Sequence, residues 1–327
     1  MIKLTSTRVR RAYYGGKNID VMMNVDDPKN TRYPEDWLGS VTIAFNPDCV
    51  VANEGLSQSL DGQFLRDIIQ KNPSDMLGPH KQMRLLFKLL DSAERLVIQG
   101  HPTISFAKEN FDSEYGKTEC WYILSDGGSV FLGFKKGITK EHWKKLFEMQ
   151  DIQGMLDCLH EFPVKRGDMI FVAGGVPHAI GKGCFMAELQ EPTDLMVIPE
   201  RVTPSGITLA ETKLHGGLGF EKMFDCFVYE GLDAEEVRER FFLKAKVQED
   251  GSQLLVGPET TDFFRLEQMD VNGSHSYNTK NYGIVLVTCG QGTINGVSAK
   301  AGDRFFVPFS EKKLDCSGEF TFLFCSA

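Results

Sequence analysis

Four side chains in this sequence are of types that bind divalent metal ions. Gln99 and His101 follow the apolar run 96–98 and lie two residues apart. In a β-strand, residues at this spacing point to the same face, so both can reach one ion. Glu119 and His178 follow glycine-containing segments and would add an oxygen and a nitrogen ligand. Because the set lacks sulfur, it favours Zn²⁺ or another divalent transition metal, with one ion per chain.

The overall composition limits the classes of protein to which this chain can belong. The 327 residues are 42% apolar and 25% charged, as in an ordinary soluble globular protein, and they suffice for two domains. A net charge of −9 argues against a nucleic-acid partner, which needs basic side chains against its phosphates. No apolar run approaches the ~20 residues of a membrane span, and residues 1–6 lack the apolar core of a signal peptide. We expect no membrane partner.

The cysteines indicate a reducing environment. There are eight, scattered and without a Cys-x-x-Cys pair: Cys49, Cys120, Cys158, Cys184, Cys226, Cys289, Cys316 and Cys325. This spacing argues against a thiolate zinc site and against a disulfide framework. We therefore expect a cytoplasmic protein.

The apolar pattern and the 32 glycines predict strands with added helices. Thr139, Asp151 and Asp233 are expected to cap three of the helices. The segment 105–116 reads as a polar loop. The clearest strands are expected at 41–45, 120–124, 129–134, 169–172 and 184–189.

Two segments of the sequence are similar to each other. In the first, Gly167-Asp168 precedes an apolar strand and His178; in the second, Gly302-Asp303 precedes a similar strand and Lys313. Both resemble the second motif of cupins, in which the last position is a metal-binding histidine. The fold class expected is therefore mainly β with added helices, in two cupin-type jelly-roll barrels. We place a metal-binding catalytic cupin domain with helical insertions at 1–240 and a second barrel lacking metal ligands at 241–327.

Four pieces of the sequence together resemble the type I phosphomannose isomerases in their compact bacterial form: Phe-Lys-Leu-Leu-Asp at 87–91, Ile-Gln-Gly-His-Pro at 98–102, Gly-Lys-Thr-Glu-Cys-Trp-Tyr at 116–122 and Val-Pro-His-Ala at 176–179. The resemblance implies a zinc-dependent interconversion of mannose 6-phosphate and fructose 6-phosphate. It places the zinc ligands at Gln99, His101, Glu119 and His178. It also places an active-site lysine at Lys117 and an aspartate at Asp194.

The sequence departs from this family around the substrate. Val97 stands where the family usually has Ser or Thr, and Ile198 where it usually has Arg. Arg201 and Lys88 are the remaining cations that we place near a phosphate. Lys88 is equally well explained as a helix lysine covering apolar neighbours. The basic cluster at 8–11 is explained best as a solvated strand face.

Two classes of function follow. In the first, an aldose–ketose isomerase moves a proton between two sugar carbons through a cis-enediol, with Lys117 as acid and base and Asp194 orienting a hydroxyl. In the second, the chain is a non-catalytic or regulatory sugar-binding cupin, which Val97 and Ile198 favour. An isomerase for another sugar is a further alternative. In each case the partner is a sugar or sugar phosphate, and the chain is a monomer or homodimer.

Overall fold

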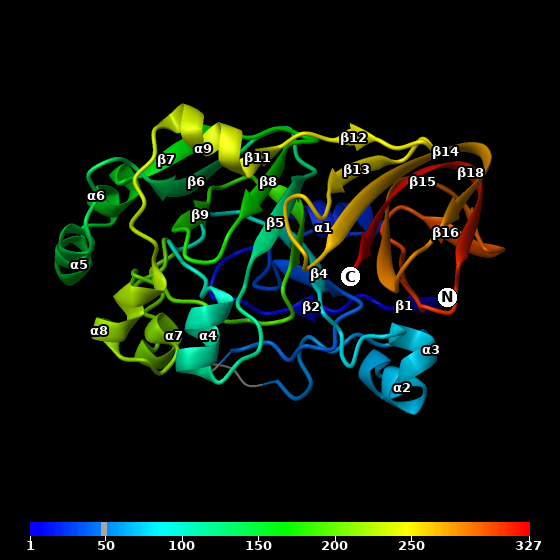
Figure 1. The fold of residues 1–327 in the computed structure, drawn as a ribbon, viewed down its shortest axis with the longest axis horizontal. Coiled ribbons are helices and arrows are strands. Elements are labelled where there is room, and N and C mark those ends of the chain that lie inside the picture. Colours follow the sequence, from blue (N-terminus) through cyan, green and yellow to red (C-terminus); the bar gives the residue numbers. More distant parts are fainter. Residues whose placement is uncertain (47–50) are drawn as a thin grey trace.

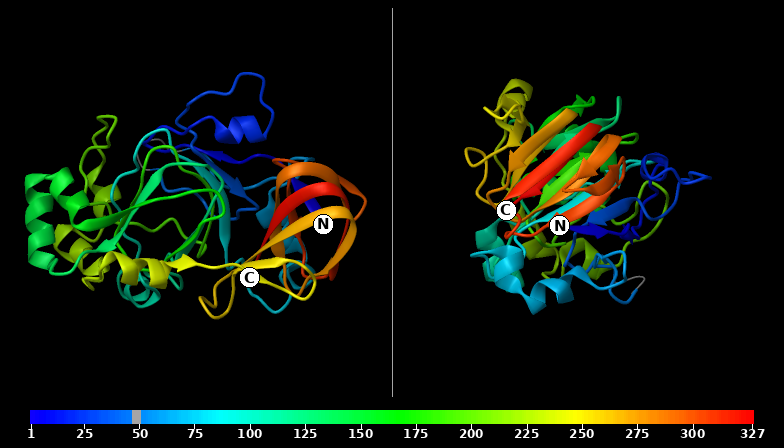
Figure 2. Two further views of the ribbon diagram at one scale, coloured as in Figure 1. Left: turned by 90° about the horizontal axis from the view of Figure 1, so that it is seen from above. Right: turned by 90° about the vertical axis from the view of Figure 1, so that its right-hand side faces the viewer.

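The computed structural model describes residues 1–46 and 51–327, and Cys49 lies outside the described residues. The strands form two curved sheet systems that lie side by side (Figures 1 and 2). The seven cysteines that the structure describes are all free thiols. Among the described helices, none has both the length and the apolar character needed to cross a bilayer.

The first sheet system carries the four candidate ligands. A seven-stranded antiparallel sheet has the order β11-β8-β5-β10-β4-β3-β2, and a three-stranded sheet has the order β7-β6-β9. Trp121, Val130 and Ile180 belong to an apolar core shared by the two sheets. The strands are β2 (Arg8–Val9), β3 (Glu35–Leu38), β4 (Leu86–Asp91), β5 (Glu119–Ile123), β6 (Ser129–Phe134), β7 (Leu159–Pro163), β8 (Met169–Val172), β9 (His178–Ile180), β10 (Phe185–Gln190) and β11 (Phe242–Leu243).

The second system is one eight-stranded sheet in the order β1-β17-β15-β18-β14-β13-β12, with β16 paired to β15. Val285, Phe305 and Phe322 are fully buried in its own apolar core. Lys313, at the start of β18, has a side chain that is 53% exposed. The strands are β1 (Ile2–Leu4), β12 (Lys246–Val247), β13 (Gln253–Val256), β14 (Arg265–Asn278), β15 (Gly283–Ile294), β16 (Val297–Lys300), β17 (Arg304–Val307) and β18 (Lys313–Ser326).

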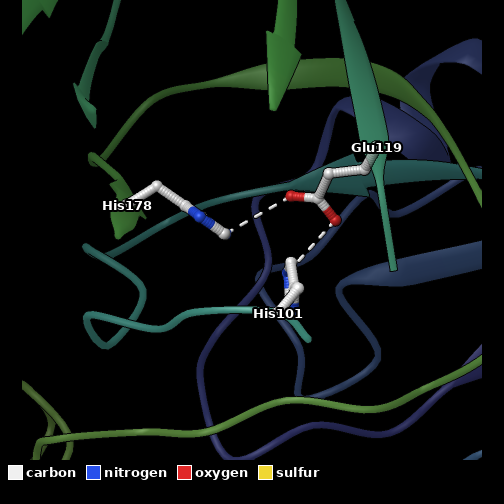
Figure 3. Close-up of side chains that lie close together, drawn as sticks. All are labelled: His101, Glu119 and His178. Carbon is white, nitrogen blue, oxygen red and sulfur yellow. Dashed lines mark ion pairs between the residues drawn. The ribbon is translucent and has the colours of Figure 1, made fainter. Parts of the chain in front are cut away.

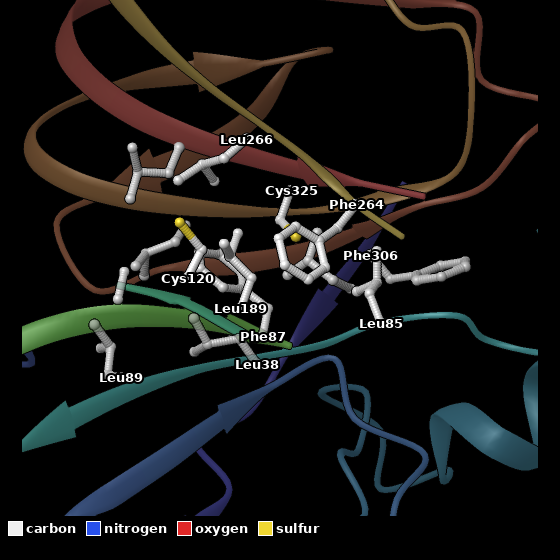
Figure 4. Packing of buried hydrophobic residues seen from close by; sticks show 14 of the residues in the cluster. Leu38, Leu85, Phe87, Leu89, Cys120, Leu189, Phe264, Leu266, Phe306 and Cys325 are labelled. Carbon is white, nitrogen blue, oxygen red and sulfur yellow. The ribbon is translucent and has the colours of Figure 1, made fainter. Parts of the chain in front are cut away.

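The two large sheets pack against each other through apolar faces (Figure 4). Phe87 and Leu189 come from β4 and β10 of the first sheet, and Leu266 and Cys325 come from β14 and β18 of the second. Alternate residues of a strand face opposite sides. The residues next to Phe87 and Leu189 in sequence therefore point into the first barrel, where the polar site lies.

Most of the described helices lie around the first system, but those at 65–71 and 73–77 lie beside the second, where the amide of Phe309 donates to Met76 O at 2.9 Å (Figure 1). Thr139, Asp151 and Asp233 cap α5, α6 and α9 through their side chains, as predicted, and Asp233 forms a capping box with Glu236. The helices are α1 (Asn18–Met22), α2 (Leu65–Lys71), α3 (Pro73–Leu77), α4 (Ile104–Phe111), α5 (Lys140–Met149), α6 (Ile152–Asp157), α7 (Glu211–His215), α8 (Phe220–Met223), η1 (Phe224–Cys226) and α9 (Ala234–Phe241).

Three local predictions were wrong. Residues 41–45 form no strand: Ile43 and Phe45 are about half exposed, and the segment makes no ladder with a neighbour. The expected loop at 105–116 contains α4, which Thr103 caps by accepting a hydrogen bond from the amide of residue 106. Lys88 lies in β4 and not in a helix, because the apolar run around it is buried on both faces of the sheet.

Each sheet system includes an edge strand from the part of the chain that forms most of the other system. Residues 2–4 (β1) pair with β17, and residues 242–243 (β11) pair with β8. The division of the chain near residue 240 stays a prediction.

Candidate metal centre and adjoining cavity

Three of the predicted ligands converge in the first barrel (Figure 3). Glu119 begins β5, His178 begins β9, and His101 follows a short bridge in which the backbones of Gln99 and His178 exchange two hydrogen bonds of 2.9 Å. Glu119 Oε2 lies 3.2 Å from His101 Nε2, and Glu119 Oε1 lies 3.3 Å from His178 Nε2. All three side chains are buried, and their ligand atoms lie within 4.8 Å of one another.

The backbone sets the tautomer of both imidazoles. His101 Nδ1 lies 3.0 Å from Leu195 O, and His178 Nδ1 lies 2.9 Å from Val176 O. A carbonyl oxygen only accepts hydrogen bonds, so each Nδ1 carries the proton and each Nε2 presents a lone pair. Burial lowers the pKa of both rings, that of His178 to about 3, which keeps them neutral.

These atoms are acceptors that face one another. Among the described residues, none donates a hydrogen bond to the buried Nε2 of His178. Two imidazole lone pairs and a carboxylate that converge in this way form a donor set for a cation. The residues present therefore fit a divalent metal ion, and their donor set suits Zn²⁺.

Lys117 supplies a positive charge at the edge of this cluster. Its Nζ lies 2.9 Å from His101 Nε2 and 2.8 Å from Glu119 Oε2. Burial alone would raise the pKa of Glu119, but Lys117 and the two histidines outweigh burial and hold that pKa well below its usual range. Trp121 Nε1 donates to Glu119 Oε1 at 3.1 Å, so both carboxylate oxygens are oriented.

A row of alternating charges continues from Lys117 across the concave face of the sheet. We call Lys117, Glu188, Lys88, Glu35 and Arg11 the charged row. Glu188 Oε1 lies 3.9 Å from Lys117 Nζ and 3.1 Å from Lys88 Nζ. Glu35 on β3 lies 3.6 Å from Lys88 Nζ and 2.9 Å from Arg11 Nε. The order of the strands, β5-β10-β4-β3, brings these side chains together in space although they are distant in sequence.

Arg11 closes the row. Its guanidinium donates two hydrogen bonds of 3.0 Å to Asp194, in addition to those to Glu35. Burial favours neutral Asp194, but Arg11 outweighs burial and lowers the pKa of this carboxyl. Asp194 is therefore a charged, immobilised residue.

A cavity lies beside the candidate metal ligands. Gln99 and Lys117 line it, together with Lys88 and Glu188 from the charged row. Gln99 thus lies in the cavity wall next to the candidate ligands, and its role as a ligand stays a prediction. The other side of the cavity is mainly apolar and includes both positions at which the sequence departs from the family, Val97 and Ile198.

The remaining predicted residues are Asp194, Arg201 and Lys88, and not all of them line the cavity. Within the described parts of the chain, the cavity lining includes neither Asp194 nor Arg201. The Arg201 guanidinium stacks over Phe147 and Phe220, 4.6 Å from each ring centre. The roles predicted for Asp194, Arg201 and Lys88 stay predictions.

Sequence reasoning missed several charged residues of the cavity, three of which belong to the row of alternating charges. Glu35, Glu188 and Arg11 are all buried there, whereas the basic cluster at 8–11 was interpreted as a solvated face. Glu188 interrupts the apolar run 185–189, and a carboxylate in a buried strand requires a partner. That signal was available in the sequence.

Comparison with known proteins identifies the chain's relatives. No family model matches it. The probable mannose-6-phosphate isomerase GmuF of Bacillus subtilis is 29% identical over 274 residues, which cover 80% of this chain and 81% of GmuF. The mannose-6-phosphate isomerase of Streptococcus mutans is 30% identical over 192 residues, 58% of this chain and 57% of that enzyme. The chain is a relative of the mannose-6-phosphate isomerases.

Solved structures of mannose-6-phosphate isomerases share the fold. The enzyme from Bacillus subtilis matches with a TM-score of 0.78 at 22% identity, over 100% of this chain and 99% of that one. A variant of phosphomannose isomerase from Salmonella typhimurium matches with a TM-score of 0.77 at 17% identity, again over 100% and 99%. The resemblance to type I phosphomannose isomerases, predicted from four motifs, and the mainly β fold class are confirmed.

Proposed function

We propose that this chain is a metal-dependent aldose–ketose isomerase that interconverts mannose 6-phosphate and fructose 6-phosphate. The observation that carries the proposal is the placement of the Lys117 ammonium. It lies within hydrogen-bond distance of two candidate metal ligands and lines the adjoining cavity. A site that only bound a sugar would have less need of a lysine at this position.

The reaction transfers protons within the sugar, and the sugar as a whole is neither oxidised nor reduced. The C–H proton at C2 of the aldose leaves, the cis-enediol forms, and a proton returns to C1, while the proton on O2 leaves and O1 gains one. A Zn²⁺ ion held by Gln99, His101, Glu119 and His178 would polarise the sugar oxygens and lower the energy of the enediolate.

The other roles in the reaction are assigned to side chains of this chain. Lys117 is the acid and base of this proposal: as the amine it would take the C2 proton, and as the ammonium it would return a proton to C1, while the hydroxyl proton passes from O2 to O1. Glu188 and Glu119 keep the Lys117 ammonium in place from two sides, at 3.9 Å and 2.8 Å. The apolar wall with Val97 and Ile198 excludes water, which strengthens these electrostatic interactions.

A specific observation favours a second candidate function. Val97 and Ile198 both line the cavity, at the positions where the family usually carries a hydroxyl and a guanidinium. A regulatory cupin that binds a sugar without converting it would tolerate these losses. We propose a cytoplasmic location for either function, with the chain acting as a monomer or homodimer.

One experiment separates the two functions. The zinc-loaded protein is incubated with mannose 6-phosphate, and separately with unphosphorylated mannose, and the ketose formed is measured. We expect conversion of mannose 6-phosphate and little or none of mannose. Failure of the zinc-loaded protein to isomerise either sugar, together with measurable binding, would favour the regulatory cupin.

A further inference from the structure

The segment 96–101, which carries two of the candidate metal ligands, has a backbone neighbour on each side. On one side, Gln99 exchanges two hydrogen bonds of 2.9 Å with His178 at the start of β9. On the other side, Gly100 exchanges two hydrogen bonds of 2.9 Å with Val197. The backbone of the segment is therefore held along both edges.

At Ile98 a side chain takes the place of a backbone partner. The amide of Ile98 donates to Glu200 Oε1 at 2.5 Å. Ile98 is fully buried, and Glu200 is only 1% exposed. A buried amide without an acceptor costs free energy. The path of the segment therefore depends on the Glu200 carboxylate.

Arg95 fixes the orientation of this carboxylate. Its guanidinium donates to both oxygens of Glu200, at 2.6 Å and 2.9 Å, and also to Leu96 O at 2.9 Å. A two-point pair of this kind fixes the plane of the carboxylate as well as its position. Glu200 is thus held by a residue that precedes the segment while it binds an amide inside the segment.

The segment 195–200 runs antiparallel to 98–101 and contacts it at three places. Leu195 O lies 3.0 Å from His101 Nδ1 and makes the first contact. The backbone pair of residues 197 and 100 makes the second, and the Glu200 carboxylate makes the third. Loss of the third contact would release one end of this line of contacts, and the imidazole of His101 would be less precisely placed.

We propose that Glu200 is a positioning residue for the metal centre. By accepting the hydrogen bond from Ile98, its carboxylate fixes the segment that carries Gln99 and His101. It acts through the backbone, since the cavity lining among the described residues does not include Glu200. The inference rests on the metal site of the proposed function. Residues that orient metal ligands from outside the coordination sphere contribute about 10- to 100-fold to metal affinity.

The test measures metal binding and does not depend on turnover. Zinc affinity of the full chain is measured by competition with a chelator of known affinity. The protein loaded with Co²⁺ in place of zinc gives a visible absorption spectrum that reports the coordination geometry. Glu200→Ala removes both the charge and the acceptor. Glu200→Gln removes the charge and keeps an oxygen that can accept from the Ile98 amide.

Two control variants separate positioning from other effects. Glu211→Gln removes the charge of a glutamate in α7 whose side chain is 70% exposed. Val285→Ala leaves a void in the apolar core of the second sheet system, so it destabilises the fold at a distance from the metal centre. A thermal unfolding curve of each variant identifies a temperature at which all of them are folded.

We expect Glu200→Ala to weaken zinc binding on the order of 10- to 100-fold and to shift the Co²⁺ absorption bands. Glu200→Gln should retain most of the affinity and the wild-type bands, and Glu211→Gln should behave as wild type. Val285→Ala should lower the melting temperature and leave zinc affinity unchanged.

Three results would overturn the proposal. The first is wild-type zinc affinity in a folded Glu200→Ala variant. The second is an equal loss in Glu200→Ala and Glu200→Gln, which would assign the effect to charge and not to position. The third is an equal loss in Val285→Ala, which would assign it to stability. The proposed function fails separately, when the wild type binds zinc with the help of Glu200 but converts no sugar phosphate.

Discussion

Lys88 and Glu188 lie directly opposite each other on β4 and β10, and Lys88 Nζ lies 3.1 Å from Glu188 Oε1. Burial raises the pKa of Glu188, and Lys88 opposes this rise by stabilising the carboxylate. Burial would lower the pKa of Lys88, but Glu188 and Glu35 outweigh burial and raise it. The pair joins the metal end of the cavity to the Arg11 end.

Removing one member of this pair should destabilise the fold. Lys88→Met leaves the buried Glu188 without its nearest cation and Glu35 with Arg11 alone, and we expect a loss of about 3–5 kcal/mol in the free energy of unfolding. Urea titration measures it, with the exposed Lys108→Met as control. The double variant Lys88→Met, Glu188→Leu should be more stable than the single one. A single-variant loss below ~1 kcal/mol would contradict this account of the charged row.

Loss of Glu119 should abolish metal binding. In Glu119→Ala the two histidine Nε2 atoms lose the carboxylate that bridges them, so zinc measured by elemental analysis should fall from about one per chain to background. Activity should disappear with the metal, and chelation of wild type should lower its melting temperature. Glu109→Ala, on the outside of α4, serves as control. Stoichiometric zinc in the Glu119→Ala protein would show that the ligand set is wrong.

Replacing Lys117 should separate metal binding from catalysis. Lys117→Met removes the proton donor while the candidate ligands remain, so kcat should fall by about 10²–10⁴-fold with zinc content near that of wild type. Steady-state kinetics and elemental analysis on the same samples provide the readout. An unchanged kcat would assign proton transfer to another group.

Protonation of Glu35 should contribute to the unfolding of the wild type at low pH. Burial opposes ionisation of Glu35, but Arg11 and Lys88 outweigh burial and lower its pKa below the unfolded value of about 4.3. Its stabilising contribution is therefore complete above that value and is lost as pH falls through the folded pKa. Glu35→Gln should be less stable than wild type at pH 7, with a flatter decline of stability between about pH 5 and 2. Equal slopes for the two proteins would exclude this role for Glu35.

The candidate metal cluster was predictable because its signals are local. His101, Glu119 and His178 each lie in a short motif with glycine or proline nearby, and the structure brings the three together. The helix caps Thr139 and Asp151 were predictable for the same reason, since a cap depends on a few adjacent residues.

The charged row was not predicted, because it depends on which strands are neighbours. Arg11, Glu35 and Glu188 meet only through the order β10-β4-β3-β2, and no spacing in the sequence encodes that order. The helical alternative for Lys88 was wrong for a related reason. A strand buried on both faces and a buried helix give the same continuous apolar run.

The pairing of Ile2 with Phe306 has a consequence for biosynthesis. During translation, β1 leaves the ribosome long before β17 has been synthesised. The backbone donors and acceptors that β1 shares with β17 therefore stay unpaired until most of the polypeptide has been made. Contacts of such sequence separation slow folding. We expect refolding to be slow, and nascent chains stalled before residue 304 to need chaperones that shield this unpaired edge.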